Sequence, residues 1–406
     1  MGEGLITRRN SSGVLIEFEN YYNFVEGLTS SAPTSLSVAR SGLAGTSVGG
    51  YALFAGGYAS ASGNASNVVD AYNTSLTHST PTDLSVAREN LAGASVGNYA
   101  LFAGGYEGYG SGNSNVVDAY DTSLTRSTPT ALSVARSGLA GTSVGNYALF
   151  AGGSGNSNVV DAYDTSLTRS TPTALSAARR SLAGASVGNY ALFAGGDTGT
   201  SGDASNVVDA YNTSLTRSTP TALSVARRFL AGTSVGNYAL FAGGYASASG
   251  NASNVVDAYD TSLTRSTPTA LSVARRSLAG ASVRDYALFA GGYISASGDA
   301  SNVVDTYDTS LIHSTPTALS EARTDLAGAS VGGYALFAGG DIGTSDNSSN
   351  VVDTYLLIVK AYIPVTQGSK YKFTEGSEQT ASTNTTLVYN QKVTGYVKYK
   401  KGKIIM

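Results

Sequence analysis

The sequence has 406 residues, which is enough to bury one large core or two ordinary ones. Its 49 Gly and 26 Tyr, with abundant Ser, Thr and Ala and no Trp, are typical of many short strands joined by tight turns, so an all-β fold is expected. The absence of Cys excludes disulfides, thiolate metal sites and cysteine nucleophiles.

Charge is divided unevenly along the chain. All eight Lys lie between Lys360 and Lys403, and all 17 Arg lie before them. Because Glu375 and Glu378 are the only acidic residues in positions 356–406, this tail has a net charge of +6, which leaves −9 on the preceding residues and −3 on the whole chain. The negative charge of the main part disfavours nucleic-acid binding, and the change in composition predicts a separate C-terminal segment.

Residues 1–27 precede the repeats and include an apolar, strand-like run at residues 13–18. Residues 4–9, Gly-Leu-Ile-Thr-Arg-Arg, are similar to the start of some phage and prophage structural proteins of gut bacteria. That resemblance implies a virion or surface-assembly component that docks to its assembly through its termini. No stretch has the length and apolarity of a signal-peptide core or a membrane span, so we expect a cytoplasmic or virion-associated location.

A tandem repeat occupies most of the chain. The segment Tyr-Ala-Leu-Phe-Ala-Gly-Gly occurs seven times at intervals of 48 residues, with one interval of 43. A shorter loop explains the exception, because residues 154–156 stand where other copies have eight residues. A period of this length is typical of propeller blades.

Each copy divides into four candidate strands, a to d. In the third copy they are residues 139–144, 147–151, 158–163 and about 167–175. Gly145-Asn146 is suited to a two-residue hairpin loop between strands a and b, which needs positive φ. Pro172 fits an outer edge strand, where a missing N–H is tolerated. The predicted fold is therefore a seven-bladed, all-β propeller with four-stranded antiparallel blades.

The copies resemble the kelch repeat, which has a double glycine after an apolar strand, a later Tyr-Asp pair and an Arg before the next unit. Here these features are Gly152-Gly153, Tyr163-Asp164 and Arg179, and the resemblance covers residues 28–355. The chain departs from the family at the outer strand, where Ser170 stands near the position of the usual Trp. The WD40 signature is absent. The resemblance implies a propeller like the central domain of galactose oxidase.

The seventh copy stops after strand c at Tyr355. Its missing fourth strand is found at the other end of the repeats, where residues 28–34 align with residues 124–130 of a complete copy. Because a ring of blades leaves open edges unless the first and last are joined, we expect residues 28–36 to close the last blade.

No catalytic or metal-binding motif is recognised. Galactose oxidase needs a cysteine-crosslinked Tyr and two His, and this chain has no Cys. His78 and His313 occupy the position of an Arg in other copies and are interpreted as exposed polar substitutes. The double glycines lead into another strand rather than a helix, so they are not phosphate loops, and the acidic loop 341–347 fits no calcium-ligand spacing. We expect a protein that is not an enzyme and has no cofactor or metal.

Every copy has one Arg before strand a and one Asp in strand c. They are Arg40, Arg88, Arg136, Arg179, Arg227, Arg275 and Arg323, and Asp70, Asp118, Asp161, Asp209, Asp257, Asp305 and Asp353. Seven equivalent arginines can form an anion-binding rim. The favoured alternative is that they pair between neighbouring blades, because buried charges need partners.

The copies differ from one another mainly in the residue pair after each Ala-Arg and in the loop between strands b and c. Both connections lie at the same end of an antiparallel blade, so the variable positions converge on one face of the disc. A rigid scaffold with varied loops is typical of a binding surface, although neutral drift after duplication also produces such variation. The predicted ligand-binding residues are Tyr58, Glu89, Asn90, Tyr106, Tyr109, Arg180, Asp197, Arg228, Phe229, Tyr245, Arg276, Tyr293, Thr324, Asp325 and Asp341.

The expected organisation is an N-terminal β extension at residues 1–27, the propeller at residues 28–355 and a Lys-rich β segment at residues 356–406. The two terminal segments are expected to pair into a small module; the alternative is that the basic tail contacts an anionic partner. The predicted function is non-catalytic recognition of a protein or glycan, and the alternative is a structural role in a phage or surface assembly.

Overall fold

The computed structural model describes residues 28–357, apart from 156, 200–202, 296 and 344–346, and the backbone of the strands named below outside that range. Contacts within the chain define two compact units. The larger unit is Ser30–Tyr355, and the smaller one combines Met1–Thr29 with Leu356–Met406. All seven copies of the repeat lie in the larger unit.

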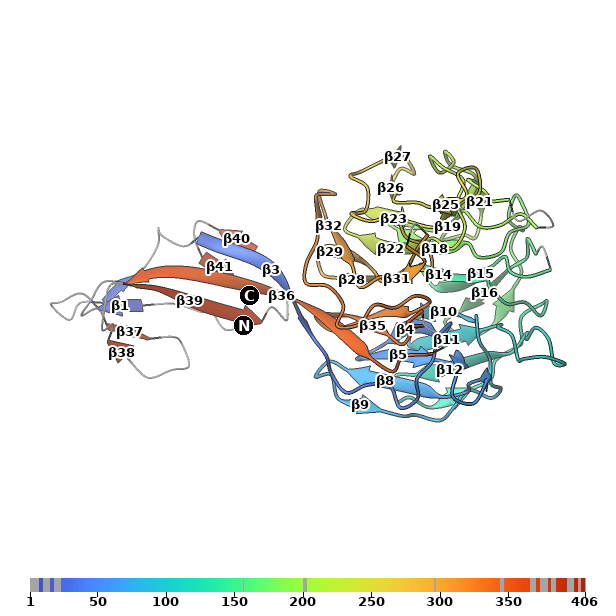
Figure 1. Ribbon diagram of the computed structural model, residues 1–406, viewed down its shortest axis with the longest axis horizontal. Coiled ribbons are helices and arrows are strands. Elements are labelled where there is room, and N and C mark those ends of the chain that lie inside the picture. The colour runs from blue at the N-terminus through green and yellow to red at the C-terminus, as the bar shows by residue number, and fades with distance from the viewer. Residues whose placement is uncertain are drawn as a thin grey trace. The chain divides into compact units, whose positions relative to one another are not determined.

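The larger unit is a seven-bladed β-propeller, in which four-stranded antiparallel sheets are arranged around a common centre (Figure 1). Blade 1 consists of β4 (Ala44–Val48), β5 (Tyr51–Ala55), β8 (Val69–Asn73) and β9 (His78–Ser79). Blade 2 consists of β10 (Ala92–Val96), β11 (Tyr99–Ala103), β12 (Val117–Asp121) and β13 (Arg126–Ser127). Blade 3 consists of β14 (Ala140–Val144), β15 (Tyr147–Ala151), β16 (Val160–Asp164) and β17 (Arg169–Ser170).

The remaining blades repeat this order. Blade 4 consists of β18 (Ala183–Val187), β19 (Tyr190–Ala194), β20 (Val208–Asn212) and β21 (Arg217–Ser218). Blade 5 consists of β22 (Ala231–Val235), β23 (Tyr238–Ala242), β26 (Val256–Asp260) and β27 (Arg265–Ser266). Blade 6 consists of β28 (Ala279–Val283), β29 (Tyr286–Ala290), β32 (Val304–Asp308) and β33 (His313–Ser314). Blade 7 consists of β34 (Ala327–Val331), β35 (Tyr334–Ala338), β36 (Val352–Val365) and β3 (Asn23–Ser31).

Among the loops as far as the structure describes them, short two-stranded ribbons extend the connection between strands b and c in three blades. They are β6 (Tyr58–Ala59) with β7 (Asn64–Ala65), β24 (Tyr245–Ala246) with β25 (Asn251–Ala252), and β30 (Tyr293–Ile294) with β31 (Asp299–Ala300).

Each blade begins with the predicted hairpin. Val144 pairs with Tyr147, so the loop between strands a and b has two residues, and its Gly145 has φ of +52°. The outer strand is shorter than predicted, since β17 is only Arg169–Ser170. Leu167, just before it, lies in the left-handed region at φ +61°, and Pro172, just after it, has no N–H to extend the ladder.

The N-terminal strand closes the ring, as predicted from the displaced repeat fragment. Strand β3 is the fourth strand of blade 7, next to β36. The hydroxyl groups of Ser31 and Thr354 lie 2.7 Å apart, and Thr306 and Ser314 make the same contact within blade 6. The inner strands β34 and β4 also contact each other, so the circle of inner strands is complete.

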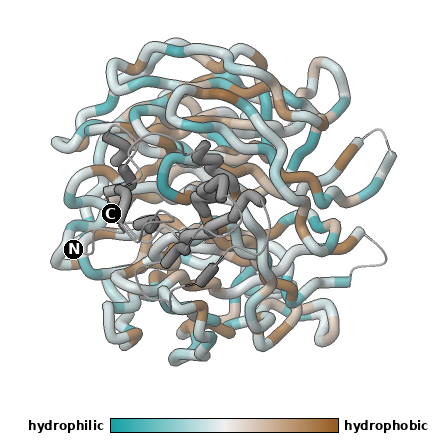
Figure 2. Tube along the Cα trace, turned by 90° about the vertical axis from the view of Figure 1, so that its left-hand side faces the viewer, coloured by the Kyte–Doolittle hydropathy of each residue, from teal (hydrophilic) through white to brown (hydrophobic). Residues whose placement is uncertain are grey.

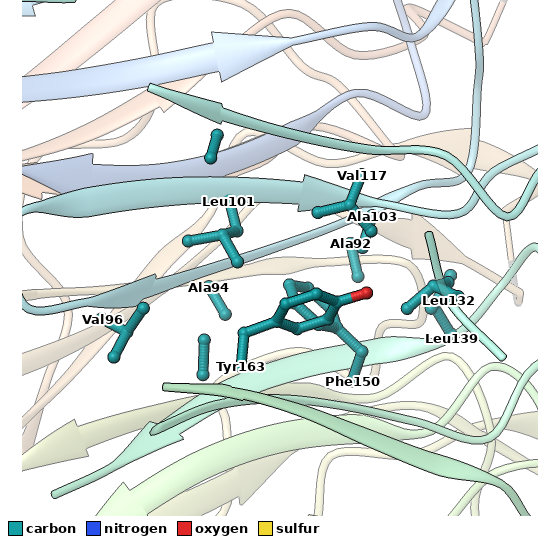
Figure 3. Close-up of a cluster of buried hydrophobic side chains, with 12 residues drawn as sticks. Ala92, Ala94, Val96, Leu101, Ala103, Val117, Leu132, Leu139, Phe150 and Tyr163 are labelled. Carbon is teal, nitrogen blue, oxygen red and sulfur yellow. The ribbon is translucent and has the colours of Figure 1, made fainter. Parts of the chain in front are cut away.

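The core consists of layers between neighbouring blades. Leu101 and Val117 of blade 2 pack against Phe150 and Tyr163 of blade 3, all at most 1% exposed (Figure 3). The two aromatic rings meet edge to face at 6.1 Å, and the Tyr163 hydroxyl donates to the carbonyl of Thr130 at 2.7 Å. Figure 2 shows the hydrophobic residues as short stretches that recur between hydrophilic ones along the propeller. A buried Tyr in strand c thus supplies an aromatic contact in each layer despite the missing Trp.

The repeated Arg and Asp form a buried ion pair within each copy, and the hydrogen bonds of the same Arg join neighbouring blades, as the favoured alternative predicted. The backbone N–H of Arg136 donates to Ser114 in blade 2, while its guanidinium donates to Asp161 and to the carbonyl groups of Gly152 (2.7 Å) and Val159 (2.9 Å) in blade 3. All seven arginines are 0% exposed. They therefore do not form an anion-binding rim.

The interpretation of the two histidines as exposed was wrong. Their side chains are only 16% exposed, and Nε2 lies 2.6 Å from Asp70 in the case of His78 and 2.7 Å from Asp305 in the case of His313. The reason is strand register: His78 is paired with Tyr72, so its side chain reaches the carboxylate two residues earlier in strand c. Arg126 reaches Asp118 at 3.5 Å from the same position.

The smaller unit is also built of strands, and the two terminal segments pair with each other. A four-stranded sheet has the order β2 (Leu15–Glu17), β1 (Thr7–Arg9), β37 (Lys370–Lys372) and β38 (Gln379–Thr380). Strand β39 (Thr385–Lys392) pairs with β36, and β40 (Lys398–Lys400) pairs with β41 (Lys403–Ile405). Within the described part of the chain, no helix has the length and apolarity to cross a bilayer.

Deletion of residues 1–35 is expected to lower the free energy of unfolding by about 2–4 kcal/mol, because it exposes the edge of β36 and removes several ladder hydrogen bonds. Chemical denaturation measures this loss. Deletion of residues 1–22, which retains all of β3, is the control. Equal stability of the shorter and the longer truncation would contradict closure by this strand.

Arg136→Ala is expected to destabilise the protein by about 3–5 kcal/mol, since it leaves Asp161 as an uncompensated buried charge. Arg169→Ala is the matched control, because Arg169 is 27% exposed and lies 3.6 Å from the other oxygen of the same carboxylate. Its loss is expected to destabilise the protein by about 1 kcal/mol or less. Similar losses for both variants would refute the role assigned to the buried arginine.

Candidate functional site: the variable face

The structure joins the two sets of variable positions directly. In blade 5, the N–H of Arg228 donates to the carbonyl of Tyr245 at 3.1 Å, and the N–H of Tyr245 donates back at 2.7 Å. The same antiparallel bridge forms in five other blades, as Ser41–Tyr58, Glu89–Tyr106, Arg180–Asp197, Arg276–Tyr293 and Thr324–Asp341. In blade 3, Ser154 donates to the carbonyl of Ser137 at 2.7 Å. We call these seven contacts the rim pairs.

The second residue of each variable pair forms a closed ring at the centre of this face. These residues are Gly42, Asn90, Gly138, Ser181, Phe229, Ser277 and Asp325, here called the inner ring. Each backbone N–H donates to the carbonyl of the equivalent residue in the preceding blade, at 2.8–3.0 Å, and Gly42 completes the circle by donating to Asp325. All seven have φ between +52° and +60°. The ring is thus held by backbone atoms, which leaves its side chains free to vary.

The inner ring and the leucines that follow it line an open cavity of about 240 Å³. The polar side chains in its wall are Asn90, Ser181, Ser277 and Asp325, and Phe229 contributes an aromatic ring that is 36% exposed. Asp325 is the only charged residue of the inner ring. Removal of water by the surrounding protein raises the pKa of Asp325, although hydrogen bonds from Ser277 and Thr324 oppose this effect. The cavity therefore offers hydrogen-bonding groups and one carboxylate to a small polar ligand.

Arginine and aromatic side chains alternate along the rim of blades 5 and 6. The guanidinium of Arg228 lies 5.5 Å from the ring centroid of Phe229 and 5.1 Å from that of Tyr245. Arg276 lies 5.8 Å from Tyr245 and 4.5 Å from Tyr293. These are cation–π distances, so each side chain holds its neighbours in place. We call this series the Arg–aromatic arc.

Asp197 anchors one end of the arc. Its Oδ2 accepts a hydrogen bond from Arg228 at 2.8 Å and lies 3.4 Å from Arg180. Desolvation alone would raise the pKa of Asp197, but hydrogen bonds from the N–H of Gly199 and from Arg228 outweigh it and lower the pKa. Asp197 is therefore a fixed negative charge that neutralises part of the positive charge of Arg228.

The other predicted residues lie on the same face outside the arc. Tyr106 and Glu89 form the rim pair of blade 2, where burial raises the pKa of Glu89, and Tyr109 is fully exposed in the adjoining loop. In blade 7, Asp341 accepts a hydrogen bond from the N–H of Gly343 at 2.6 Å. No group of His, Asp or Glu among the described residues is arranged to hold a metal; residues 344–346 of the acidic loop lie outside that range.

Sequence reasoning missed the contacts that join neighbouring loops. Ser247 accepts a hydrogen bond from the N–H of Ala204 at 3.0 Å, and Ser295 accepts one from Ala252 at 3.0 Å. Ser60 accepts one from Ser348 at 2.9 Å, across the junction of blades 7 and 1. The only sequence signal is a Ser at the same place in the longer loops. These bonds stiffen the face on which the variable side chains stand.

Comparison with protein-family models gives no match for this chain, and neither does comparison with curated proteins. The class of the protein is defined by its structure, a seven-bladed β-propeller of four-stranded blades. Its distinguishing feature is the face made by the rim pairs and the inner ring.

Phe229→Gly is expected to leave the free energy of unfolding unchanged or to raise it by up to about 1 kcal/mol. An L-residue in the left-handed region loses about 1–2 kcal/mol, which the contact with Arg228 offsets only in part. Thermal denaturation tests this, and Gly138→Phe, at the equivalent position in blade 3, is expected to be destabilising. A marked loss of stability in Phe229→Gly would show that Phe229 contributes to the fold.

Proposed function

We propose that this protein is a non-catalytic recognition module that binds a protein or glycan through its variable face. One observation supports this most directly: in every blade, the positions that vary between copies are paired with each other on one side of the disc. The scaffold below them is rigid, because the inner strands, the buried Arg–Asp pairs and the inner ring repeat from blade to blade. Such a construction lets side chains change without a change of fold.

The proposal includes the kelch-type class of propeller. The double glycine allows a backbone conformation that other residues rarely adopt, since Gly152 and Gly153 lie at φ +69° and +122°. In this conformation the carbonyl of Gly152 accepts a hydrogen bond from the buried Arg136. A side chain at Gly152 would place its Cβ 2.4 Å from the carbonyl oxygen of Arg179. Two features shared with the kelch repeat, the double glycine and the Arg, therefore belong to the same contact between blades.

The non-catalytic part of the proposal is supported by the contacts of the titratable groups. His78 and His313 are directed at aspartates that also accept hydrogen bonds from buried arginines. On the variable face, Asp197 is paired with Arg228. These groups have structural partners that account for their positions.

A combined variant with Tyr106, Arg228, Phe229 and Tyr293 changed to Ala is expected to bind at least about tenfold more weakly to the ligand found for the intact protein, because it removes large contact side chains from three blades. Binding to a glycan array and to bacterial surfaces provides the first measurement. A matched variant changes Asn98, Asn146, Asn189 and Asn237 to Ala, which are exposed turn residues at the opposite end of the blades.

Loss of binding in the first variant alone, with equal melting temperatures, would support recognition by the variable face. Equal loss in both variants, or in the turn variant alone, would place recognition elsewhere. If the intact protein binds neither glycans nor cell surfaces, drift of the loops together with a purely structural role becomes the better interpretation.

A further inference from the structure

Two arginines at equivalent positions on the rim, Arg228 and Arg276, can be compared with each other. Arg228 and Arg276 stand at equivalent positions, one 48-residue repeat apart, and each lies between two aromatic rings. The residue that pairs with Arg228 is Asp197, in the preceding blade, at 2.8 Å. The position equivalent to Asp197 for Arg276 is Tyr245, again 48 residues later. The repeat therefore places a carboxylate beside the first arginine and a phenol beside the second.

Arg276 is consequently left without a hydrogen-bond acceptor, and Asp325 acts on it only through its charge. Among the described residues, no side chain or carbonyl accepts a hydrogen bond from its guanidinium, and its Nε is buried without a partner. Arg228 also has an unpaired Nε, but its Nη1 is bonded to Asp197. A guanidinium held over ring faces keeps its in-plane donors available for a planar acceptor, and a carboxylate is the acceptor that matches them best. Arg276 therefore lacks the carboxylate acceptor that Asp197 provides to Arg228, and a ligand carboxylate can supply it.

The surroundings of Arg276 favour a sugar as the bearer of that carboxylate. The next residue, Ser277, lies in the wall of the central cavity with Asp325, Ser181 and Asn90, all of which form hydrogen bonds suited to hydroxyl groups. The cavity volume of about 240 Å³ is below the roughly 300–1,000 Å³ of sites for drug-sized ligands, so it admits a group no larger than about one sugar ring. The exposed ring of Phe229 adds an apolar surface for the C–H face of such a ring.

An acidic polypeptide fits this face less well. The core of a protein interface needs a cluster of apolar and aromatic anchors. The large hydrophobic side chains exposed among the described residues are Tyr109, Val134, Phe229 and Ile312, and of these only Phe229 lies in the wall of the cavity. The aromatic rings next to Arg276 are those of Tyr245 and Tyr293, which are engaged with its guanidinium.

We propose that the rim at Arg276, between Tyr245 and Tyr293, is a subsite for a carboxylated sugar residue. Arg276 binds the carboxylate, and the polar wall of the cavity binds the hydroxyl groups. This inference rests on the proposed function and names the class of ligand for the same face.

Titration calorimetry with two matched pairs of probes tests the proposal: sialyllactose against lactose, and trigalacturonic acid against its methyl ester. The intact protein is expected to bind at least one acid at least about tenfold more tightly than its neutral partner. Arg276→Gln is expected to remove this preference without changing the melting temperature. Arg126→Gln is expected to retain it, since Arg126 lies on the outer strand β13, is paired with Asp118 and belongs to neither the rim pairs nor the inner ring.

Tyr245→Asp provides the sharpest test, because it reproduces within the chain the carboxylate that Asp197 offers to Arg228. The new carboxylate is expected to pair with Arg276 and to exclude the acidic sugar, while the protein stays folded with an unchanged or higher melting temperature. Tyr245→Asn removes the same ring without supplying the charge, and it is expected to bind the acid at least about tenfold more tightly than Tyr245→Asp does.

The outcomes separate this inference from the proposed function. Binding of neutral sugars or of a protein that depends on the variable face, with no preference for acids, would overturn the subsite and leave the proposed function in place. Binding of an acidic peptide but of neither acidic sugar would overturn the ligand class. Preference for the acid that survives Arg276→Gln, or absence of any binding to the four probes, would also overturn the subsite.

Discussion

The buried ion pair at each connection between blades is the contact on which the propeller depends. An arginine in the connection, such as Arg136, is bonded through its backbone N–H to the preceding blade and through its guanidinium to the aspartate and two carbonyl groups of the following one. Burial lowers the pKa of Arg136, and the attraction of Asp161 opposes that effect. Because neither charge is stable inside the protein without the other, the pair fixes the position of each blade against its neighbour.

Most of the scaffold could be predicted from the sequence because its signals are local and repeated. The interval of the repeat predicts the number of blades and their strands. The repeat fragment before Leu36 predicts that the N-terminal strand completes the last blade. The environment of His78 could not be predicted, because it depends on the register in which His78 pairs with Tyr72. This register directs His78 at Asp70, which also accepts a hydrogen bond from Arg40, a residue in the connection before strand a. The contacts of the Arg–aromatic arc could not be predicted from the sequence either, because Tyr245 contacts arginines from two different copies.

The inner ring explains how one scaffold accepts such different residues at its centre. Glycine, asparagine, serine, phenylalanine and aspartate all occupy the same backbone conformation, since the hydrogen bonds that fix it involve no side-chain atoms. Phe229 keeps a left-handed conformation that Gly42 and Gly138 adopt without strain. Variation at these positions changes the chemistry of the cavity and leaves the geometry of the disc intact.

The closure of blade 7 also has a mechanical consequence. Strands β3 and β36 are antiparallel, as the contacts of Thr29 with Leu356 and of Ser31 with Thr354 indicate, so the chain enters and leaves the ring at the same end of this pair. A tensile force applied between the N-terminal end of β3 and the C-terminal end of β36 would load these hydrogen bonds one after another rather than all together. The pairing of β3 with β36 would then break residue by residue from one end. The other six blades would bear no load until these two strands had separated.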